Sequence, residues 1–221
     1  MRFTDQSFQA HVVLVHGLWL NGLEWMPLRR RMTRRGYDCH VFRYPSVRQT
    51  PAQNARRLLS FVERLGAGRV HLVGHSLGGI VIMHAAGLAS RLPPGRAVFI
   101  ATPALGSHAA RRLVRLGAPG RLLGASRHGG LLGDVPQWDP ARELGIIAGD
   151  LPLGAGRMLG GLARPNDGAV AVAETEVAGA SDRICLHGTH LGLLWLRETA
   201  DRVDRFLRHG RFGRAPDAVQ K

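Results

Sequence analysis

The chain has 221 residues, of which 45% are hydrophobic and 21% are charged. A single domain of this size buries about 70% of the surface of its unfolded chain, so its core needs no disulfide or metal ion. The two cysteines exclude a disulfide-rich scaffold, and every apolar run falls short of the ~18 residues that span a membrane. The first ten residues lack the basic patch and apolar stretch of a secretory signal. We therefore expect one globular domain over residues 1–221, located in the cytoplasm.

Basic residues dominate the charge of the chain. Lysine and arginine total 30 against 16 acidic residues, which gives a net charge of +14, and Lys221 is the only lysine. A GC-rich genome produces the same excess of arginine without any functional demand. The alternative is attraction to acidic partners or to anionic membrane surfaces, and we expect at most a weak association of this kind. The arginines are dispersed and no nucleic-acid-binding signature is present, so we expect no nucleic-acid partner.

Short apolar runs alternate along the chain with amphipathic stretches. The runs typical of buried strands are residues 11–15, 37–44, 69–73, 97–101, 146–148 and 184–186. The stretches typical of helices are residues 23–35, 51–65, 76–89 and 191–207. This alternation predicts an α/β fold with a mainly parallel sheet and helices on both faces. In such sheets ligands bind at the carboxyl ends of the strands, so the loops that follow the strands should carry the chemistry.

Residues 103–140, referred to below as the insertion, interrupt this alternation. Ala109, Leu113 and Leu116 recur at helical spacing beside several arginines, and Gly-rich loops follow. One interpretation is a small helical cap or lid whose apolar underside covers the functional site. The other is an extra solvated helix with no role in access.

The sequence Gly-His-Ser-Leu-Gly at residues 74–78 is the strongest functional signal. It follows a predicted strand directly and leads into an apolar helix. A nucleophile elbow has this pattern, because its serine takes a strained conformation on a sharp turn that leaves little room for neighbouring side chains. Gly74 and Gly78 meet that demand. The alternative is a glycine-rich turn that Ser76 merely caps, but the placement between strand and helix favours Ser76 as a nucleophile.

A serine nucleophile also needs backbone N–H donors for the oxyanion that forms on attack. His16 and Gly17 follow the first predicted strand directly, which is where proteins with a nucleophile elbow place one of these donors. We expect the N–H of Leu18 to be that donor and the N–H of Leu77, at a helix start, to be the second. The alternative for His16 and Gly17 is a tight turn after a strand.

The acid and the base should follow the serine in chain order. Among the eleven histidines, His190 lies on the loop after the last predicted strand, whereas His187 belongs to the strand end. We therefore expect His190 to be the base that activates Ser76. Asp167, in a turn-forming Pro-Asn-Asp-Gly cluster, is the expected acid. Asp150, which follows the fifth predicted strand, is its main rival.

Four segments in this order make the chain resemble the α/β-hydrolase superfamily, in particular small bacterial lipases and esterases with a reduced sheet. The segments read VVLVHGLW, HLVGHSLGG, PNDGAVAV and HGTHLGLL. The resemblance covers residues 11–208, and it separates Asp167 from Asp150. Carried over by position, it implies Ser76 as nucleophile, Asp167 as acid and His190 as base. The insertion is longer and more basic than the corresponding region of the smallest lidless lipases, and we expect the sheet to lack the first two strands of a full-length hydrolase sheet.

The expected reaction is cleavage of a small-molecule acyl ester through an acyl-enzyme intermediate, with no metal and no cofactor. An acyltransferase or thioesterase with the same three residues is the first alternative, because only the acceptor or the leaving group differs. A non-catalytic binding protein with a hydrolase fold is the second. Its mark would be a missing member of the triad, and none is missing from this sequence.

Overall fold

Six parallel strands form the centre of the molecule. The computed structural model describes residues 10–88, 92–154 and 161–213. The strands are β1 (Ala10–Val15), β2 (Tyr37–Phe42), β3 (Val70–His75), β4 (Ala97–Ile100), β5 (Leu144–Gly149) and β6 (Asp182–Leu186). They lie in the order β2-β1-β3-β4-β5-β6, and every neighbouring pair is parallel. The prediction of an α/β fold with a mainly parallel sheet is confirmed.

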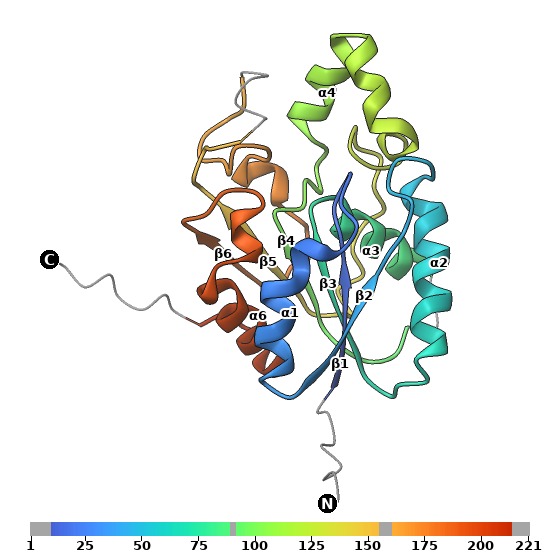
Figure 1. The fold of residues 1–221 in the computed structure, drawn as a ribbon, viewed down its shortest axis with the longest axis vertical. Coiled ribbons are helices and arrows are strands. Elements are labelled where there is room, and N and C mark those ends of the chain that lie inside the picture. The colour runs from blue at the N-terminus through green and yellow to red at the C-terminus, as the bar shows by residue number, and fades with distance from the viewer. Residues whose placement is uncertain (1–9, 89–91, 155–160, 214–221) are drawn as a thin grey trace, which may run out of the picture.

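Helices cover both faces of this sheet. The helical segments are η1 (Leu23–Trp25), α1 (Met26–Thr33), α2 (Pro51–Arg64), α3 (Leu77–Leu88), α4 (His108–Arg115), η2 (Ala118–Arg127), η3 (Val172–Thr175), η4 (Gly192–Leu194) and α6 (Arg197–His209). Helices α1 and α6 pack on one face, and α2 and α3 pack on the other (Figure 1). No helix among the described residues combines the length and the hydropathy needed to cross a membrane.

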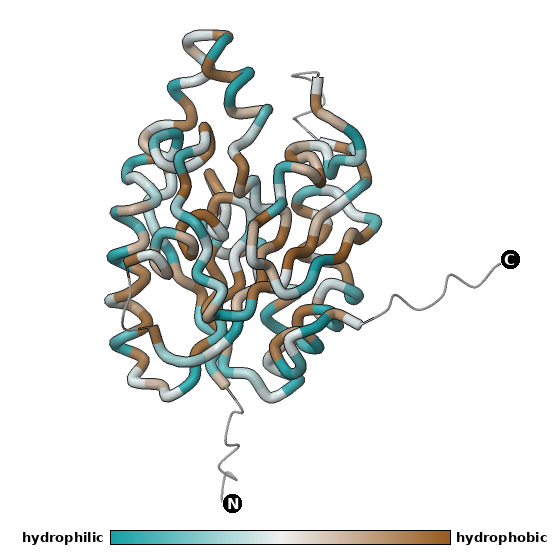
Figure 2. The backbone as a smooth tube through the Cα atoms, turned by 180° about the vertical axis from the view of Figure 1, so that it is seen from behind, coloured by the Kyte–Doolittle hydropathy of each residue, from teal (hydrophilic) through white to brown (hydrophobic). Residues whose placement is uncertain are grey.

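Side-chain alternation along the strands divides the core between the two faces. On β1, Val12 and Leu14 join the cluster under α1 and α6, whereas Val13 and Val15 join the cluster under α2 and α3. Figure 2 shows the hydrophobic residues gathered along the central strands, while the outer helices alternate between hydrophobic and hydrophilic positions. Both faces of the sheet are buried, which explains why the strands read as continuous apolar runs rather than as alternating ones.

The predicted terminal helix over residues 191–207 is wrong as a single element. The chain first forms the short turn η4, in which Leu193 and Leu194 are fully buried. It then extends at Leu196, with ψ at 137°, before α6 begins. Burying two adjacent leucines of η4 and then the apolar face of α6 requires a change of direction, which one straight helix cannot provide.

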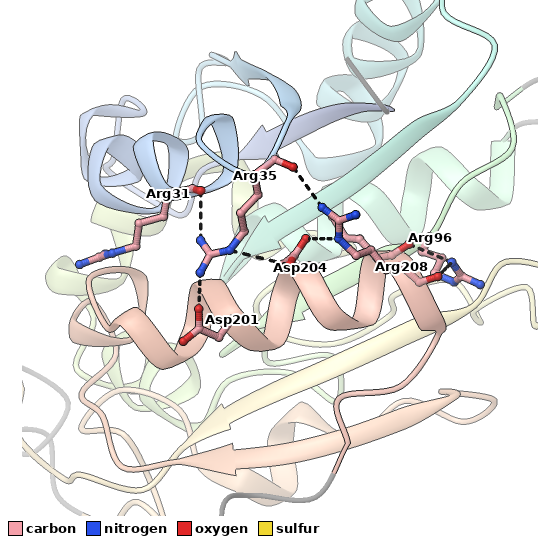
Figure 3. Close-up of polar contacts among 7 residues, drawn as sticks. Arg31, Arg35, Arg96, Asp201, Asp204 and Arg208 are labelled. Carbon is pink, nitrogen blue, oxygen red and sulfur yellow. Dashed lines mark hydrogen bonds and ion pairs between the residues drawn. The ribbon is translucent and has the colours of Figure 1, made fainter. Parts of the chain in front are cut away.

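Part of the arginine excess joins α1 to α6 (Figure 3). The guanidinium of Arg35 pairs with Asp201 and lies 3.8 Å from the Asp204 carboxylate. Arg208 donates from Nε to Asp204 Oδ1 at 2.7 Å and from a terminal nitrogen to the Arg35 carbonyl at 3.0 Å. Isolated surface ion pairs contribute little, but here the charges form a network between two helices that already pack together. These arginines therefore have a structural role.

Candidate active site

The site lies where the order of the strands reverses. Strands β1 and β3 are neighbours in the sheet, and the chain leaves them toward opposite sides, so the loops after them meet at one edge. A cavity of about 440 Å³ opens there. Its walls are mostly apolar, and they include Gly17, Leu18, Trp19, His75, Ser76, Val170 and His190. The loops that the sequence singled out thus converge on one cavity.

Ser76 lies on a strained turn between β3 and α3. Its φ is +53°, a value that is costly for a residue with a side chain and recurs at functional sites. The surrounding glycines explain how the chain reaches this conformation. A Cβ atom on Gly74 would overlap the backbone of Gly79, and one on Gly78 would overlap the Val15 carbonyl of β1. The strand and the helix therefore approach as closely as the expected elbow requires.

A buried histidine and a tyrosine hold the loop after β1. Tyr44 N–H donates to His16 Nε2 at 3.2 Å, so Nδ1 carries the proton of His16 and donates to the Gly17 carbonyl at 2.8 Å. The Tyr44 hydroxyl in turn donates to the His16 carbonyl at 2.7 Å. Burial lowers the pKa of His16, which keeps the ring neutral. Sequence reasoning missed this function of Tyr44, because the two residues are 28 positions apart.

The two residues predicted to supply N–H donors lie close to the turn that carries Ser76. Leu18 lines the cavity, and a Cβ atom on the preceding Gly17 would lie 3.2 Å from the Cβ atom of Ser76. Leu77 is the first residue of α3, where backbone N–H groups have no acceptor within the helix. Within the described residues, the N–H of Leu18 has no hydrogen-bond acceptor, and the N–H of Leu77 has none outside α3. Both groups are thus available to a ligand.

Asp167 and His190 form a buried hydrogen-bonded pair. His190 Nδ1 lies 2.8 Å from Asp167 Oδ2, and the side chain of Asp167 is only 1% exposed. The other carboxylate oxygen accepts the N–H groups of Ala169 and Val170 at 2.9 and 2.7 Å. Burial by itself would raise the pKa of Asp167, but His190 and these two N–H groups lower it below its ordinary value. The carboxylate therefore stays charged beside the imidazole.

The bond to Asp167 assigns the free nitrogen of His190. Nδ1 carries the donated proton, so Nε2 is left with a lone pair, and His190 lines the same cavity as Ser76. The Ser76 hydroxyl has no hydrogen-bond partner within the part of the chain that the structure describes. Contacts between a nucleophile and its base commonly tighten only when the substrate binds.

His75 contacts His190 through a hydrogen bond and through its ring. Its Nε2 donates to the His190 carbonyl at 3.0 Å, and the two ring centroids lie 4.7 Å apart. Burial lowers the pKa of His75 to about 3, so the ring is neutral, and its Nδ1 is buried without a partner among the described residues. Sequence reasoning placed His75 inside the elbow but did not find this contact, which joins residues 115 positions apart.

Comparison with known proteins identifies the family of this fold and site. The sequence profile described as the alpha/beta hydrolase family matches residues 12–219. The chain belongs to the alpha/beta hydrolase family. No curated protein matches its sequence. Membership covers nearly the whole chain and supports hydrolase activity.

Solved structures of similar fold include three hydrolytic enzymes. The mature lipase BlEst2 of Bacillus licheniformis is 19% identical over 90% of this chain and 91% of its own, with a TM-score of 0.70. The carboxylesterase CesB of Bacillus subtilis is 16% identical over 91% and 84%, with a TM-score of 0.58. The NocB thioesterase domain from the nocardicin cluster is 22% identical over 90% and 95%, with a TM-score of 0.61. At these identities the likeness establishes the fold.

The rival Asp150 and a further aspartate of this alpha/beta hydrolase, Asp182, have other partners. Asp150 binds His187, with Asp150 Oδ1 2.8 Å from His187 Nδ1, and both side chains are exposed. Asp182, at the start of β6, accepts the N–H of Phe212 at 2.7 Å. Neither carboxylate contacts His190. The structure therefore brings together Ser76, Asp167 and His190 in one place and leaves Asp150 outside it.

The insertion supplies the opposite wall of the cavity. Its lining residues are Pro103, Ser107, Ala109, Ala110, Leu113, Leu123 and Leu131. Several polar contacts attach it to the rest of this alpha/beta hydrolase. The Glu174 carboxylate accepts the backbone N–H of His108 at the start of α4, and Trp19 Nε1 donates to the Leu122 carbonyl at 3.0 Å. Sequence reasoning missed Glu174, because nothing in its neighbourhood along the chain indicates this contact.

Proposed function

We propose that this alpha/beta hydrolase cleaves carboxylic esters with Ser76, His190 and Asp167 as a catalytic triad. The hydrogen bond of 2.8 Å between His190 and the buried Asp167 carries the proposal, because it leaves Nε2 of His190 as the acceptor in the cavity that Ser76 lines. An imidazole held in this tautomer by a charged carboxylate is the base that a serine hydroxyl needs.

The reaction proceeds in two halves. Ser76 Oγ attacks the ester carbonyl while His190 Nε2 takes the hydroxyl proton, and the N–H groups of Leu18 and Leu77 bind the oxyanion. His190 then gives its proton to the departing alkoxide, which leaves an acyl group on Ser76. In the second half, water gives a proton to His190 and attacks the acyl group. Collapse releases the acid and returns the proton to Ser76. Asp167 stays ionised and stabilises the imidazolium.

The insertion acts as the cap of this site and selects the acyl part of the substrate. The wall that it supplies is apolar, and Leu113 and Leu123 contribute aliphatic side chains to it. An acyl chain buried against such a wall gains about 0.8 kcal/mol for each methylene. A cavity of about 440 Å³ accommodates an acyl chain of medium length. We therefore propose uncharged acyl esters as substrates rather than esters of charged acids.

A series of nitrophenyl esters from acetate to dodecanoate tests the proposal, together with labelling by a fluorophosphonate. Ser76→Ala should retain the circular dichroism spectrum of the fold and lose both turnover and labelling. Ser60→Ala, on the exposed side of α2, is the matched control and should keep both. Turnover by Ser76→Ala at the wild-type rate would refute the triad. Absence of labelling in the wild-type protein would favour a non-catalytic binding protein.

A thioesterase reaction is the second candidate, because the NocB thioesterase domain shares the fold over nearly the whole chain. The triad would be the same, and the leaving group would be a thiol rather than an alcohol. Measuring kcat/KM for matched acyl esters and acyl thioesters distinguishes the two reactions. Adding an alcohol or amine acceptor and counting the products distinguishes hydrolysis from acyl transfer. Thioester turnover more than tenfold above that of the matched ester would replace the ester proposal.

A further inference from the structure

Three potential metal ligands meet on one face of the sheet, away from the triad. His11 lies on β1, and Asp38 and His40 lie on the neighbouring edge strand β2. In the register of the two strands, His11 is directly opposite Asp38. His40 follows Asp38 by two residues, so its side chain emerges on the same face. The strands therefore place two imidazoles and one carboxylate side by side.

The ligand atoms of these three residues lie close together. His11 Nδ1 lies 2.9 Å from His40 Nε2, and Asp38 Oδ2 lies 3.4 Å from the first nitrogen and 3.2 Å from the second. The two rings are nearly parallel, with 14° between their planes and 5.2 Å between their centroids. All three ligand atoms lie within 4.8 Å of one another. Without an ion, one of the two rings donates its N–H to the lone pair of the other, so the contact is an N–H···N hydrogen bond.

We propose that His11, Asp38 and His40 bind one divalent transition-metal ion of the zinc class. Two neutral imidazoles and one carboxylate form a donor set that suits Zn²⁺ and its neighbours in the first transition row. Bonds of ~2.0–2.1 Å from the ion to each ligand require the two nitrogens to separate by only a few tenths of an ångström. On binding, the hydrogen-bonded proton moves to the other nitrogen of its own ring, so that both facing nitrogens coordinate the ion through their lone pairs.

The surroundings of the three ligands permit entry of the ion. The side chains of His11, Asp38 and His40 are 31%, 34% and 24% exposed, so the ligands are partly buried but open to water on one side. Three protein ligands with an open fourth position leave room for a coordinated water molecule. The ion would join β2, which pairs only with β1 in the described sheet, to the body of the molecule.

The site is independent of the proposed hydrolysis. His11 and Asp38 are the second residues of β1 and β2, whereas Ser76 and the loop after β1 that line the cavity follow the carboxyl ends of β3 and β1. We therefore propose that the ion stabilises the edge strand β2 and takes no part in the reaction. No spacing along the chain indicates the site, because its members come from different strands, with His11 and His40 separated by 29 positions.

Calorimetric titration of the chelator-treated full chain with Zn²⁺ tests the proposal. We expect one ion to bind to each chain, and Co²⁺ to bind in its place with visible absorption bands. His40→Gln should lower the Zn²⁺ affinity by about 100-fold or more, and His11→Asn should do the same. His187→Gln removes an exposed histidine that also pairs with an aspartate, and this matched control should leave the affinity unchanged.

Stability provides a second readout. At a free Zn²⁺ concentration 100 times the Kd, binding should raise the Tm of the wild-type protein by about 5 °C or more and should leave that of His40→Gln unchanged. Asp38→Asn replaces His40→Gln if the latter fails to fold. Absence of Zn²⁺ binding by the wild-type protein would refute the site, and so would equal affinity in wild type and His40→Gln. Neither result bears on Ser76, whose fluorophosphonate labelling is measured separately.

Discussion

The cavity has a floor and a roof that differ in how they are built. The floor consists of the carboxyl ends of the strands and the loops that follow them. There, Ser76 occupies a strained turn, and the buried side chains of Asp167 and His75 each form a hydrogen bond to His190. The roof is the insertion, which faces the cavity with aliphatic side chains and contacts the body through the polar groups of Glu174 and Trp19. Bond making requires groups held rigidly, whereas selection of an acyl chain requires only apolar volume. The comparison predicts that changes in the floor affect the rate and that changes in the roof affect the choice of substrate.

The largest effect should come from removing the charge in the floor. Asp167→Asn keeps the size of the side chain but no longer holds the required tautomer of His190, so kcat should fall by about 10⁴-fold. Asp150→Asn is the matched control, because Asp150 binds His187 rather than His190, and its kcat should change less than twofold. Ester hydrolysis assays measure both. Equal losses in the two variants would contradict the assignment of Asp167.

Acid should destabilise the sheet that carries the floor, through two buried imidazoles of β3. Burial, with the nearby positive charge of Arg96, lowers the pKa of His71 to about 4, and burial lowers that of His75 to about 3. Both values lie below those of the unfolded chain, so stability is full above pH ~6.5 and declines as the pH falls. From pH 6.5 to pH 5, the free energy of unfolding should decrease by about 2 kcal/mol for each histidine, since only the unfolded state takes up the protons.

Urea denaturation at a series of pH values measures this decline. His71→Gln preserves an acceptor for the Arg96 N–H that His71 Nδ1 binds at 2.9 Å, and it removes one of the two protonation sites. The decline between pH 6.5 and pH 5 should therefore be smaller in this variant by about half. A decline of the same size in wild type and His71→Gln would show that the imidazole of His71 does not contribute.

Filling the roof should change the choice of substrate more than the rate. Leu113→Trp places extra volume in the apolar wall of the cavity. The value of kcat/KM for a decanoate ester should fall about tenfold more than that for a butyrate ester, because several methylenes of the long acyl chain lose their contacts with the wall. Leu116→Trp is the matched control, because Leu116 belongs to the same insertion but is 61% exposed. A uniform loss over all chain lengths in Leu113→Trp would contradict the division between floor and roof.

The smallest effect concerns the outer surface of the roof. Arg112, Arg115 and Arg121 are exposed there beside the exposed Leu116 and Leu122, and none of the three has an ion-pair partner within the described ranges. We propose that this surface associates weakly with anionic membranes. Binding to vesicles with phosphatidylserine should be measurable at low salt and should disappear at high salt, because each arginine contributes about 1 kcal/mol near such a surface.

Replacing these three arginines by glutamine should abolish vesicle binding and leave ester turnover unchanged. The matched control replaces Arg56, Arg57 and Arg64, which are exposed on α2 and also have no ion-pair partner in the described part of the chain. Equal losses of binding in both triple variants would indicate a response to total charge alone. Binding that persists at high salt would contradict an electrostatic association.

The sequence by itself determined the alternation of strands and helices, the parallel sheet and the location of Ser76. These features depend on neighbours in the chain. Apolar runs indicate buried strands, and glycines around Ser76 indicate the close approach of strand and helix, as the overlap of a Cβ atom on Gly78 with Val15 shows. The resemblance of four segments to the α/β-hydrolase superfamily also predicted which aspartate and which histidine would meet.

Tertiary structure alone decided the contacts that support and enclose the site. The hydrogen bond from His75 to the His190 carbonyl joins residues 115 positions apart, and that from Trp19 to the Leu122 carbonyl joins residues 103 positions apart. The interruption of the helix before α6 likewise depends on where Leu193 and Leu194 of η4 are buried. Local spacing carries no information about such contacts, because they depend on how whole elements pack, and packing is determined by the shape of all the elements together.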